Sequence, residues 1–254
     1  MAELTDPQLE RYARHVVLDE VGEEGQLRLL ATKVLVIGAG GLGAPVALYL
    51  AAAGIGTIGL IDDDTVDLSN LQRQIVHGTA DIGRPKVASA ADTLARINPE
   101  IAVIQHRERL TAENGAALIA GYDIIADGSD NFRTRYLLND LCIKAGKILV
   151  SAALLRFDGQ LSTYKAHLGD PHPCYRCLFP EEPPADLIPR CETAGIFGAV
   201  AGVMGSLQAT EVLKEALDLG DSLSGQLLIY DGLSTTFRKI KVKRRTDCPG
   251  CGGH

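Results

Sequence analysis

The sequence predicts an α/β protein with a Rossmann-like, doubly wound and mostly parallel sheet, added C-terminal strands and a four-cysteine metal site. Three observations predict this class. Short apolar runs alternate with helical patterns through residues 33–150, as in parallel sheets that are covered by helices. A glycine-rich turn follows the first apolar run, and two Cys-x-x-Cys pairs lie far apart in the second half. We expect one domain over residues 1–254.

The first 150 residues are expected to hold N-terminal helices (1–30) and a parallel half of the sheet (31–150). An apolar stripe at helical spacing joins Leu9, Tyr12, Ala13, Val16 and Val17. It should pack on the main domain or on a second subunit. The expected strands are 33–37, 57–61, 101–104, 123–127 and 148–150. The expected helices are 42–53, 85–98, 112–120 and 132–144, with a loop or short helix at 67–73.

Residues 151–254 are expected to extend the sheet. The expected strands are 160–166, 227–231 and 236–242, and an acidic, proline-rich loop at 179–186 precedes a helix at 196–217. This helix is apolar on more than one face, which suits burial in a dimer interface.

Composition restricts the partners and the compartment. The net charge of -7 disfavours nucleic acid, because phosphate binding needs a basic face. The polar N-terminus does not resemble a signal peptide, and no apolar run reaches the roughly 20 residues of a membrane span. We therefore expect a cytoplasmic protein without a nucleic-acid or membrane partner.

The two cysteine pairs predict one zinc site. Cys174 and Cys177 form the first pair, and Cys248 and Cys251 form the second. In a reducing cytosol such pairs indicate metal ligands before disulfides. Four thiolates complete a tetrahedron, so the zinc should be structural. A redox pair or two unrelated turns are the alternatives, and Cys142 is expected in the core.

The glycine-rich turn predicts a nucleotide site in residues 31–150. Gly38, Gly40 and Gly43 follow a strand and open a helix, where backbone N–H groups can approach phosphate. Asp62 ends the next strand, where a carboxylate can bind ribose hydroxyls. These features fit NAD and ATP equally well, and a plain packing turn is the alternative.

Polar residues after Asp62 favour ATP. Arg73 and Lys86 suit a triphosphate better than a nicotinamide, although both could be ordinary surface charges. Residues 127–131 lie at the carboxyl end of another expected strand, so Asp130 could hold Mg²⁺ at the same sheet edge. The alternative for Asp130 and Asn131 is that one of them caps the following helix.

Taken together, these motifs resemble the MoeB/ThiF/HesA family, the bacterial relatives of ubiquitin-activating enzymes. The resemblance covers residues 6–251 and leans toward the molybdopterin-type enzymes. The motifs that carry it are the glycine loop 38–43, Asp62-x-Asp64, 68–74, 83–86, 129–131, the N-terminal Arg11-Tyr12-x-Arg14 and the two cysteine pairs.

The resemblance implies adenylylation, with ATP and Mg²⁺, of the C-terminal Gly-Gly carboxylate of a ubiquitin-like sulfur carrier protein. By family position, the nucleotide site would contain Gly38, Gly40, Gly41, Gly43, Asp62, Asp64, Ser69, Asn70, Leu71, Gln72, Arg73, Lys86, Asp130 and Asn131. Arg73 and Lys86 would hold phosphates, and Asp130 would serve Mg²⁺ and catalysis. Arg14 would reach the ATP of the partner subunit in a homodimer.

The same resemblance makes residues 151–254 the carrier-binding and zinc-containing half. It implies a separate sulfur donor of the desulfurase or rhodanese type, while the carrier could belong to molybdopterin, thiamine, tRNA-thiolation or secondary pathways. Some relatives use a cysteine near this position to form a covalent sulfur or thioester link with the carrier, so Cys191 is either such a cysteine or an incidental loop cysteine. The basic run 238–245 is either a charged edge strand or a docking surface for an acidic carrier.

Two other functions remain open on the sequence. An NAD-dependent oxidoreductase would need a nicotinamide pocket and a partner residue for hydride transfer, and neither is evident. A non-catalytic scaffold stabilised by zinc would bind the carrier without releasing pyrophosphate.

Overall fold

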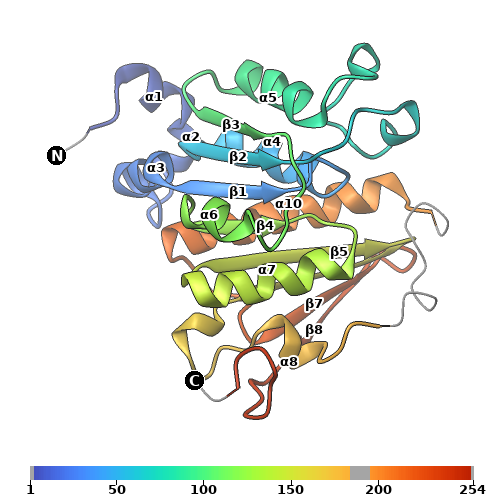
Figure 1. Cartoon of the computed structure of the whole chain (residues 1–254). Helices are drawn as coiled ribbons and strands as arrows, with labels where there is room; N and C mark the ends of the chain where they lie inside the picture. Colours follow the sequence, from blue (N-terminus) through green and yellow to red (C-terminus); the bar gives the residue numbers. More distant parts are fainter. Residues whose placement is uncertain (1–2, 184–194, 253–254) are drawn as a thin grey trace.

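The centre of the molecule is a mixed eight-stranded sheet in the order β3-β2-β1-β4-β5-β6-β7-β8 (Figure 1). The structure, a computed structural model, describes residues 3–183 and 195–252. The strands are β1 (Lys33–Ile37), β2 (Thr57–Ile61), β3 (Ala102–His106), β4 (Ile124–Asp127), β5 (Ile148–Leu155), β6 (Asp158–Tyr164), β7 (Gln226–Asp231) and β8 (Thr236–Lys241).

The five strands from β3 to β5 are parallel, and their register brings three carboxyl ends together. Ile37, the last residue of β1, pairs with Ile61 of β2 and with Asp127 of β4. The segments that follow these strands are therefore neighbours in space. Residues 34–36 are fully buried, as expected for a parallel strand between two helical layers.

Helices cover both faces of the parallel half, which confirms the doubly wound prediction. One face carries α4 (Gly43–Ala53), α5 (Lys86–Ile97) and α10 (Gly198–Leu217), and the other carries α6 (Gly115–Ala120) and α7 (Phe132–Ala145). Shorter turns are η1 (Leu68–Asn70), η2 (Thr79–Asp81), η3 (Ala166–Leu168) and α8 (Tyr175–Leu178). Each layer buries its own apolar cluster against the sheet.

The predicted N-terminal stripe is only partly right. The segment divides into α1 (Asp6–Arg11) and α2 (Ala13–Val16), followed by α3 (Gly22–Ala31). Tyr12 lies at the break, is 2% exposed, and its hydroxyl accepts a hydrogen bond of 2.8 Å from Asn98 Nδ2. Val17, which the prediction placed on the stripe, follows the end of α2 and is 69% exposed. The stripe therefore packs on the main domain through Tyr12.

The second half extends the sheet with antiparallel strands. β5 continues beyond the expected residue 150 because it pairs with β6 from Leu149 as far as Leu155. The long helix α10 lies on β5, β6 and α4, so its buried apolar side chains are explained within one chain. β8 is the outermost strand, and its residues are exposed. Among the described residues, no helix combines the length and apolar character that crossing a bilayer requires.

Candidate nucleotide site and four-cysteine centre

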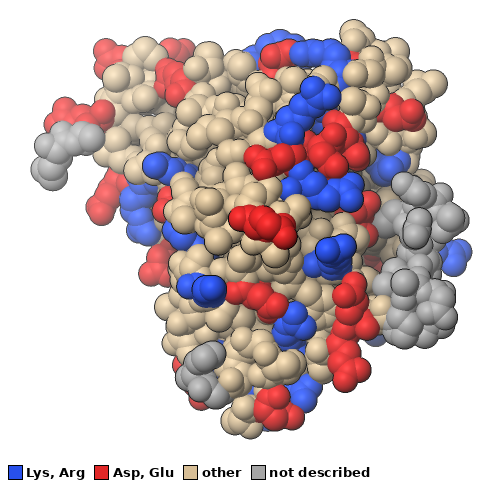
Figure 2. Space-filling model, viewed as in Figure 1, with Lys and Arg blue, Asp and Glu red and all other residues tan. Residues whose placement is uncertain are grey.

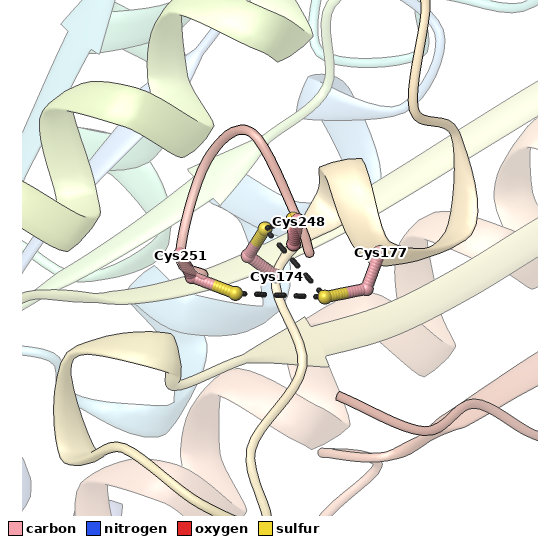
Figure 3. A group of neighbouring side chains, drawn as sticks. All are labelled: Cys174, Cys177, Cys248 and Cys251. Carbon is pink, nitrogen blue, oxygen red and sulfur yellow. Dashed lines mark hydrogen bonds between the residues drawn. The ribbon is translucent and has the colours of Figure 1, made fainter. Parts of the chain in front are cut away.

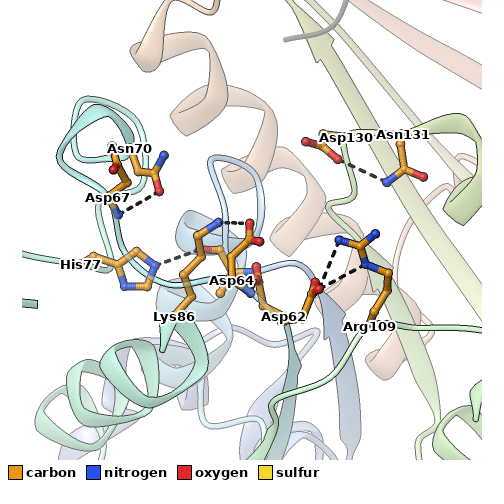
Figure 4. Close-up of polar contacts among 11 residues, drawn as sticks. Asp62, Asp64, Asp67, Asn70, His77, Lys86, Arg109, Asp130 and Asn131 are labelled. Carbon is orange, nitrogen blue, oxygen red and sulfur yellow. Dashed lines mark hydrogen bonds and ion pairs between the residues drawn. The ribbon is translucent and has the colours of Figure 1, made fainter. Parts of the chain in front are cut away.

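A cavity of about 660 Å³ lies at the carboxyl ends of β1, β2 and β4. Its walls come from segments that the strand register brings together. Among the predicted site residues, those that line it are Gly38, Gly40, Gly41, Asp62, Asp64, Arg73, Lys86, Asp130 and Asn131. The structure therefore gathers most of the predicted nucleotide residues around one space (Figure 4).

The glycine loop needs glycine at two positions. Gly38 has a φ of +85°, which residues with a Cβ rarely adopt. At Gly43, a Cβ atom would lie 1.8 Å from the carbonyl oxygen of Gly38. The first turn of α4 thus lies directly against the loop, an arrangement that suits an anion such as phosphate.

Replacing Gly43 by alanine is expected to destabilise the protein by about 2–3 kcal/mol, because the loop must move away from α4. Gly202→Ala is the matched control, since a Cβ at this position in α10 meets no atom within 4 Å. It should be neutral or stabilising by up to about 1 kcal/mol. Urea denaturation measures both, and equal midpoints would contradict the packing argument.

Three consecutive carboxylates, Asp62–Asp64, lie within 4.8 Å of one another, and each has its own partner. Asp62 accepts hydrogen bonds from the backbone N–H of Ala39 at 2.8 Å and of Asp64 at 2.9 Å. Asp63 pairs with Arg109 at 3.2 Å, and Asp64 pairs with Lys86 at 2.8 Å. The Asp62 carboxylate is therefore held against the glycine loop.

Lys86 and Arg73 reach the cavity from different elements. Lys86 begins α5, and its side chain is 8% exposed with its ammonium beside Asp64 (Figure 4). Arg73 follows η1, donates to the carbonyl oxygen of Ser69 at 3.0 Å, and lies along Gly41. Both cations therefore border the same space as the glycine loop, as predicted.

The residues just before Arg73 form the turn that carries it. Asn70 Oδ1 accepts a hydrogen bond from the Asp67 N–H at 3.2 Å, and Asp67 caps η1 by accepting from the Ser69 N–H. Among the predicted site residues, those that do not line the cavity are Gly43, Ser69, Asn70, Leu71, Gln72 and Arg14. Gly43 begins α4, the next four residues belong to η1 and the turn that follows it, and Arg14 is an exposed residue of α2.

Asp130 and Asn131 differ in their local contacts. Asn131 is the N-cap of α7, since its Oδ1 accepts from the Thr134 N–H at 2.9 Å. The helix-cap alternative is therefore correct for Asn131. Asp130 is exposed at the cavity, and its carboxylate accepts a hydrogen bond of 3.3 Å from Asn131 Nδ2 (Figure 4). Its oxygens thus face open space that a cation could enter.

The predicted site residues leave out four buried polar side chains at this site: Gln74, His77, Ser129 and Arg135. Gln74 and Ser129 belong to the motifs that carry the family resemblance, but no role was predicted for them. Gln74, Ser129 and Arg135 line the cavity, and each has one buried polar atom without a hydrogen-bond partner among the described residues. Burial lowers the pKa of His77, which keeps the ring neutral near pH 7. The only sequence signal is a histidine after two apolar residues, and that pattern does not indicate a role.

The four cysteines of the two pairs form one buried cluster (Figure 3). The Sγ–Sγ distances are 3.5 Å for Cys174–Cys248, 3.5 Å for Cys177–Cys251 and 4.0 Å for Cys174–Cys177. A tetrahedral zinc with bonds of about 2.3 Å has S–S edges of about 3.8 Å. The donor set and its spacing therefore fit a zinc ion.

The surroundings of one of these thiols favour its ionised form, which is the form that binds a metal ion. Burial raises the pKa of Cys174 and of Cys251, the latter to about 11. Burial acts to raise the pKa of Cys248, but hydrogen bonds from the backbone N–H groups of Gly250 and Cys251, together with those of the Cys174 and Cys177 side chains, lower the pKa to about 7. The expectation that Cys142 lies in the core is confirmed, since this residue of α7 is 2% exposed.

The basic run 238–245 lies on the outer strand and the segment after it. Residues 238–241 are exposed, which agrees with a charged edge strand. Arg244 donates to the carbonyl oxygens of Ala166, His172 and Cys251, and so ties the second cysteine pair to the domain. In the view of Figure 2, Lys and Arg are interspersed with Asp and Glu. Cys191 lies outside the described residues.

Comparison with known proteins gives the family. Residues 12–250 match the sequence profile of the ThiF family. The chain is 50% identical to the Adenylyltransferase and sulfurtransferase MOCS3 of Sus scrofa, covering 99% of this chain and 55% of that protein. It therefore spans about half the length of this relative.

Two further relatives match over most of their own length. The SAMP-activating enzyme E1 of Haloferax volcanii is 49% identical, covering 96% of this chain and 89% of that protein. The Sulfur carrier protein adenylyltransferase of Thermus thermophilus is 47% identical, covering 98% and 92%. The solved structure of E. coli MccB with ATP has the same fold, with a TM-score of 0.82 at 23% identity, covering 95% of this chain and 73% of that one. This chain belongs to the ThiF family.

Proposed function

We propose that this chain is an adenylyltransferase that activates the C-terminal Gly-Gly carboxylate of a ubiquitin-like sulfur carrier protein. In the reaction, the carboxylate attacks the α-phosphorus of ATP, and pyrophosphate leaves. Sulfur at the sulfide level, supplied by a separate donor, then attacks the acyl carbon of the carrier acyl-adenylate, AMP leaves, and the carrier ends in a thiocarboxylate. The observation that carries the proposal is the single cavity that joins the glycine loop, Asp62, two cations and Asp130.

The reaction requires the protein to position the two substrates and to compensate the charge on the phosphate oxygens. A carboxylate nucleophile is already ionised at pH 7, so no general base is required. Negative charge develops on the phosphate oxygens, and fixed cations stabilise it. In this proposal Asp62 binds the ribose, and Arg73 and Lys86 bind the phosphates. Lys86 gives one hydrogen bond to Asp64 and keeps two donors for phosphate oxygens.

Two metals belong to the proposal. Asp130 is an exposed carboxylate at the cavity, and such an oxygen ligand suits Mg²⁺, which usually keeps several waters and bridges to phosphates. Bound there, Mg²⁺ would offset charge on the triphosphate. The four cysteines would hold zinc, with no open position for substrate, and its contribution would be to the stability of the C-terminal half.

We also propose a homodimer that works in the cytoplasm and receives sulfur from a separate donor of the desulfurase or rhodanese type. The dimer rests on the family resemblance, which assigns Arg14 to the partner's ATP; Arg14 is exposed and does not line the cavity of its own chain, which is compatible with that role. In a dimer it would reach the partner's ATP. Free cysteines that fit zinc rather than disulfides support a reducing compartment.

The experiment is mass spectrometry of purified Gly-Gly-ended carriers after incubation with the protein, ATP and Mg²⁺, with pyrophosphate measured in parallel. We expect one carrier class to gain AMP with equal release of pyrophosphate. A carrier without its last glycine is the matched control and should gain nothing. Binding of ATP with no adduct on any carrier would contradict the proposed reaction and favour the scaffold.

A further inference from the structure

His77 lies where three parts of the nucleotide site meet. It follows the Arg73 turn by four residues and is 7% exposed. Its Nε2 lies 3.0 Å from the carbonyl oxygen of Ala39 in the glycine loop, and its Nδ1 lies 2.9 Å from Ser89 Oγ on α5. Figure 4 shows the His77 ring beside Lys86. One buried ring thus connects the loop, the Arg73 segment and the helix that begins with Lys86.

The contacts select one form of the ring. A carbonyl oxygen can only accept a hydrogen bond, so Nε2 must carry the proton and donate to Ala39. In the neutral ring, Nδ1 then accepts from the Ser89 hydroxyl. Burial of His77 and the nearby Lys86 disfavour the doubly protonated ring, and Asp81 and Asp62 oppose them. Both ring nitrogens are satisfied in the neutral Nε2–H form.

The Ala39 residue is held from both sides. Its N–H donates to Asp62 Oδ2 at 2.8 Å, and its carbonyl accepts from His77. Ala39 stands between Gly38 and Gly40, and glycine does not restrict its own backbone. The two peptide planes around Ala39 therefore take their direction from these two side chains.

The other end of the ring is equally fixed. Ser89 is fully buried and lies three residues after Lys86, on the same side of α5. The Thr93 hydroxyl donates to the carbonyl oxygen of Val76 at 2.9 Å, so the residue before His77 is also tied to α5. A movement of the glycine loop relative to the helix that carries Lys86 must therefore break a His77 hydrogen bond.

We propose that His77 is a positioning residue for ATP. Its Nε2–H sets the direction of the glycine-loop peptides, and its Nδ1 holds the loop at a fixed distance from α5, the helix that begins with Lys86. The inference rests on the proposed nucleotide function. A misplaced glycine loop would weaken its contacts with the nucleotide, and small misplacements of binding groups cost up to about 100-fold. The loss of this anchor should therefore appear in ATP affinity rather than only in stability.

Two substitutions separate the contacts of the ring. His77→Gln can place an amide NH₂ near Nε2 and keep the bond to Ala39, whereas His77→Asn can reach only Ser89. Each removes one hydrogen bond, so their melting temperatures should be similar. We expect His77→Gln to keep the Kd and KM for ATP within about threefold, and His77→Asn to raise both by about 10–100-fold with a smaller change in kcat. Ser89→Ala, which leaves the Ala39 contact in place, should resemble His77→Gln.

A readout in the nucleotide-free protein distinguishes this inference from the proposed reaction. The amide NMR signals of Gly40 and Gly41 should stay near their parent positions in His77→Gln and should shift or broaden in His77→Asn. Equal effects of the two variants on these signals and on ATP affinity would overturn the positioning role, as would a loss of stability in His77→Asn with unchanged affinity. Absence of carrier adenylylation by the parent protein would count against the proposed reaction alone.

Discussion

Replacing Asp130 by alanine is expected to lower the rate of carrier adenylylation about 10²–10³-fold while the fold survives. The carboxylate is exposed at the cavity, and its one described side-chain contact is a 3.3 Å hydrogen bond from Asn131. Removing it should therefore change the free energy of unfolding by less than about 0.5 kcal/mol. The loss of rate would follow from the loss of the oxygen ligand proposed for Mg²⁺. ATP–pyrophosphate exchange measures the rate, and thermal unfolding measures the stability.

The matched control is Asp63→Ala. Asp63 also lines the cavity and carries the same charge, but it is paired with Arg109 and has no proposed role in catalysis. Its removal should leave exchange within about threefold of the parent. Similar losses in both variants would mean that only the net charge of the cavity matters. Unchanged exchange in Asp130→Ala would remove Asp130 from the proposed mechanism.

Replacing Cys248 by serine is expected to abolish zinc binding and to destabilise the C-terminal half by about 5 kcal/mol. Apparent zinc-binding free energies of structural sites are about 10 kcal/mol or more at pH 7, and that binding energy contributes to folding. The cluster joins a segment beside α8 to the end of the chain, and Arg244 adds three hydrogen bonds around it. Metal analysis and thermal unfolding, with and without a chelator, measure both effects.

Cys142→Ala serves as the control for this variant. Cys142 is as buried as the cluster cysteines but lies in α7, within a different apolar cluster. Its replacement should cost about 1 kcal/mol and leave the zinc content unchanged. A parent protein that holds no zinc, or a Cys248→Ser variant with the parent's melting temperature, would contradict the four-cysteine assignment.

The parallel half could be predicted closely because its signals are local. Residues 33–37 and 57–61 are strands with the expected bounds, since short apolar runs between glycine or polar residues are typical of buried parallel strands. The helix predicted at 132–144 is α7, which ends one residue later at a glycine with positive φ. The break at Tyr12 was not predictable in this way, because it depends on a contact with Asn98, far along the chain.

The candidate site, like the fold, was predictable only where the sequence carries a local signal. The sequence by itself determined which residues could bind a nucleotide and a metal, because glycine loops, Asp62, Arg73, Lys86 and paired cysteines carry their chemistry in residue type and spacing. It also determined the family.

Only the tertiary structure decided how these residues work together. It showed that Asn131 caps α7 while Asp130 stays open to the cavity, that Lys86 pairs with Asp64, and that His77 anchors the glycine loop. The physical reason is that hydrogen bonds and burial depend on distances between segments that meet only when the parallel strands align. Such distances leave no local pattern in the sequence.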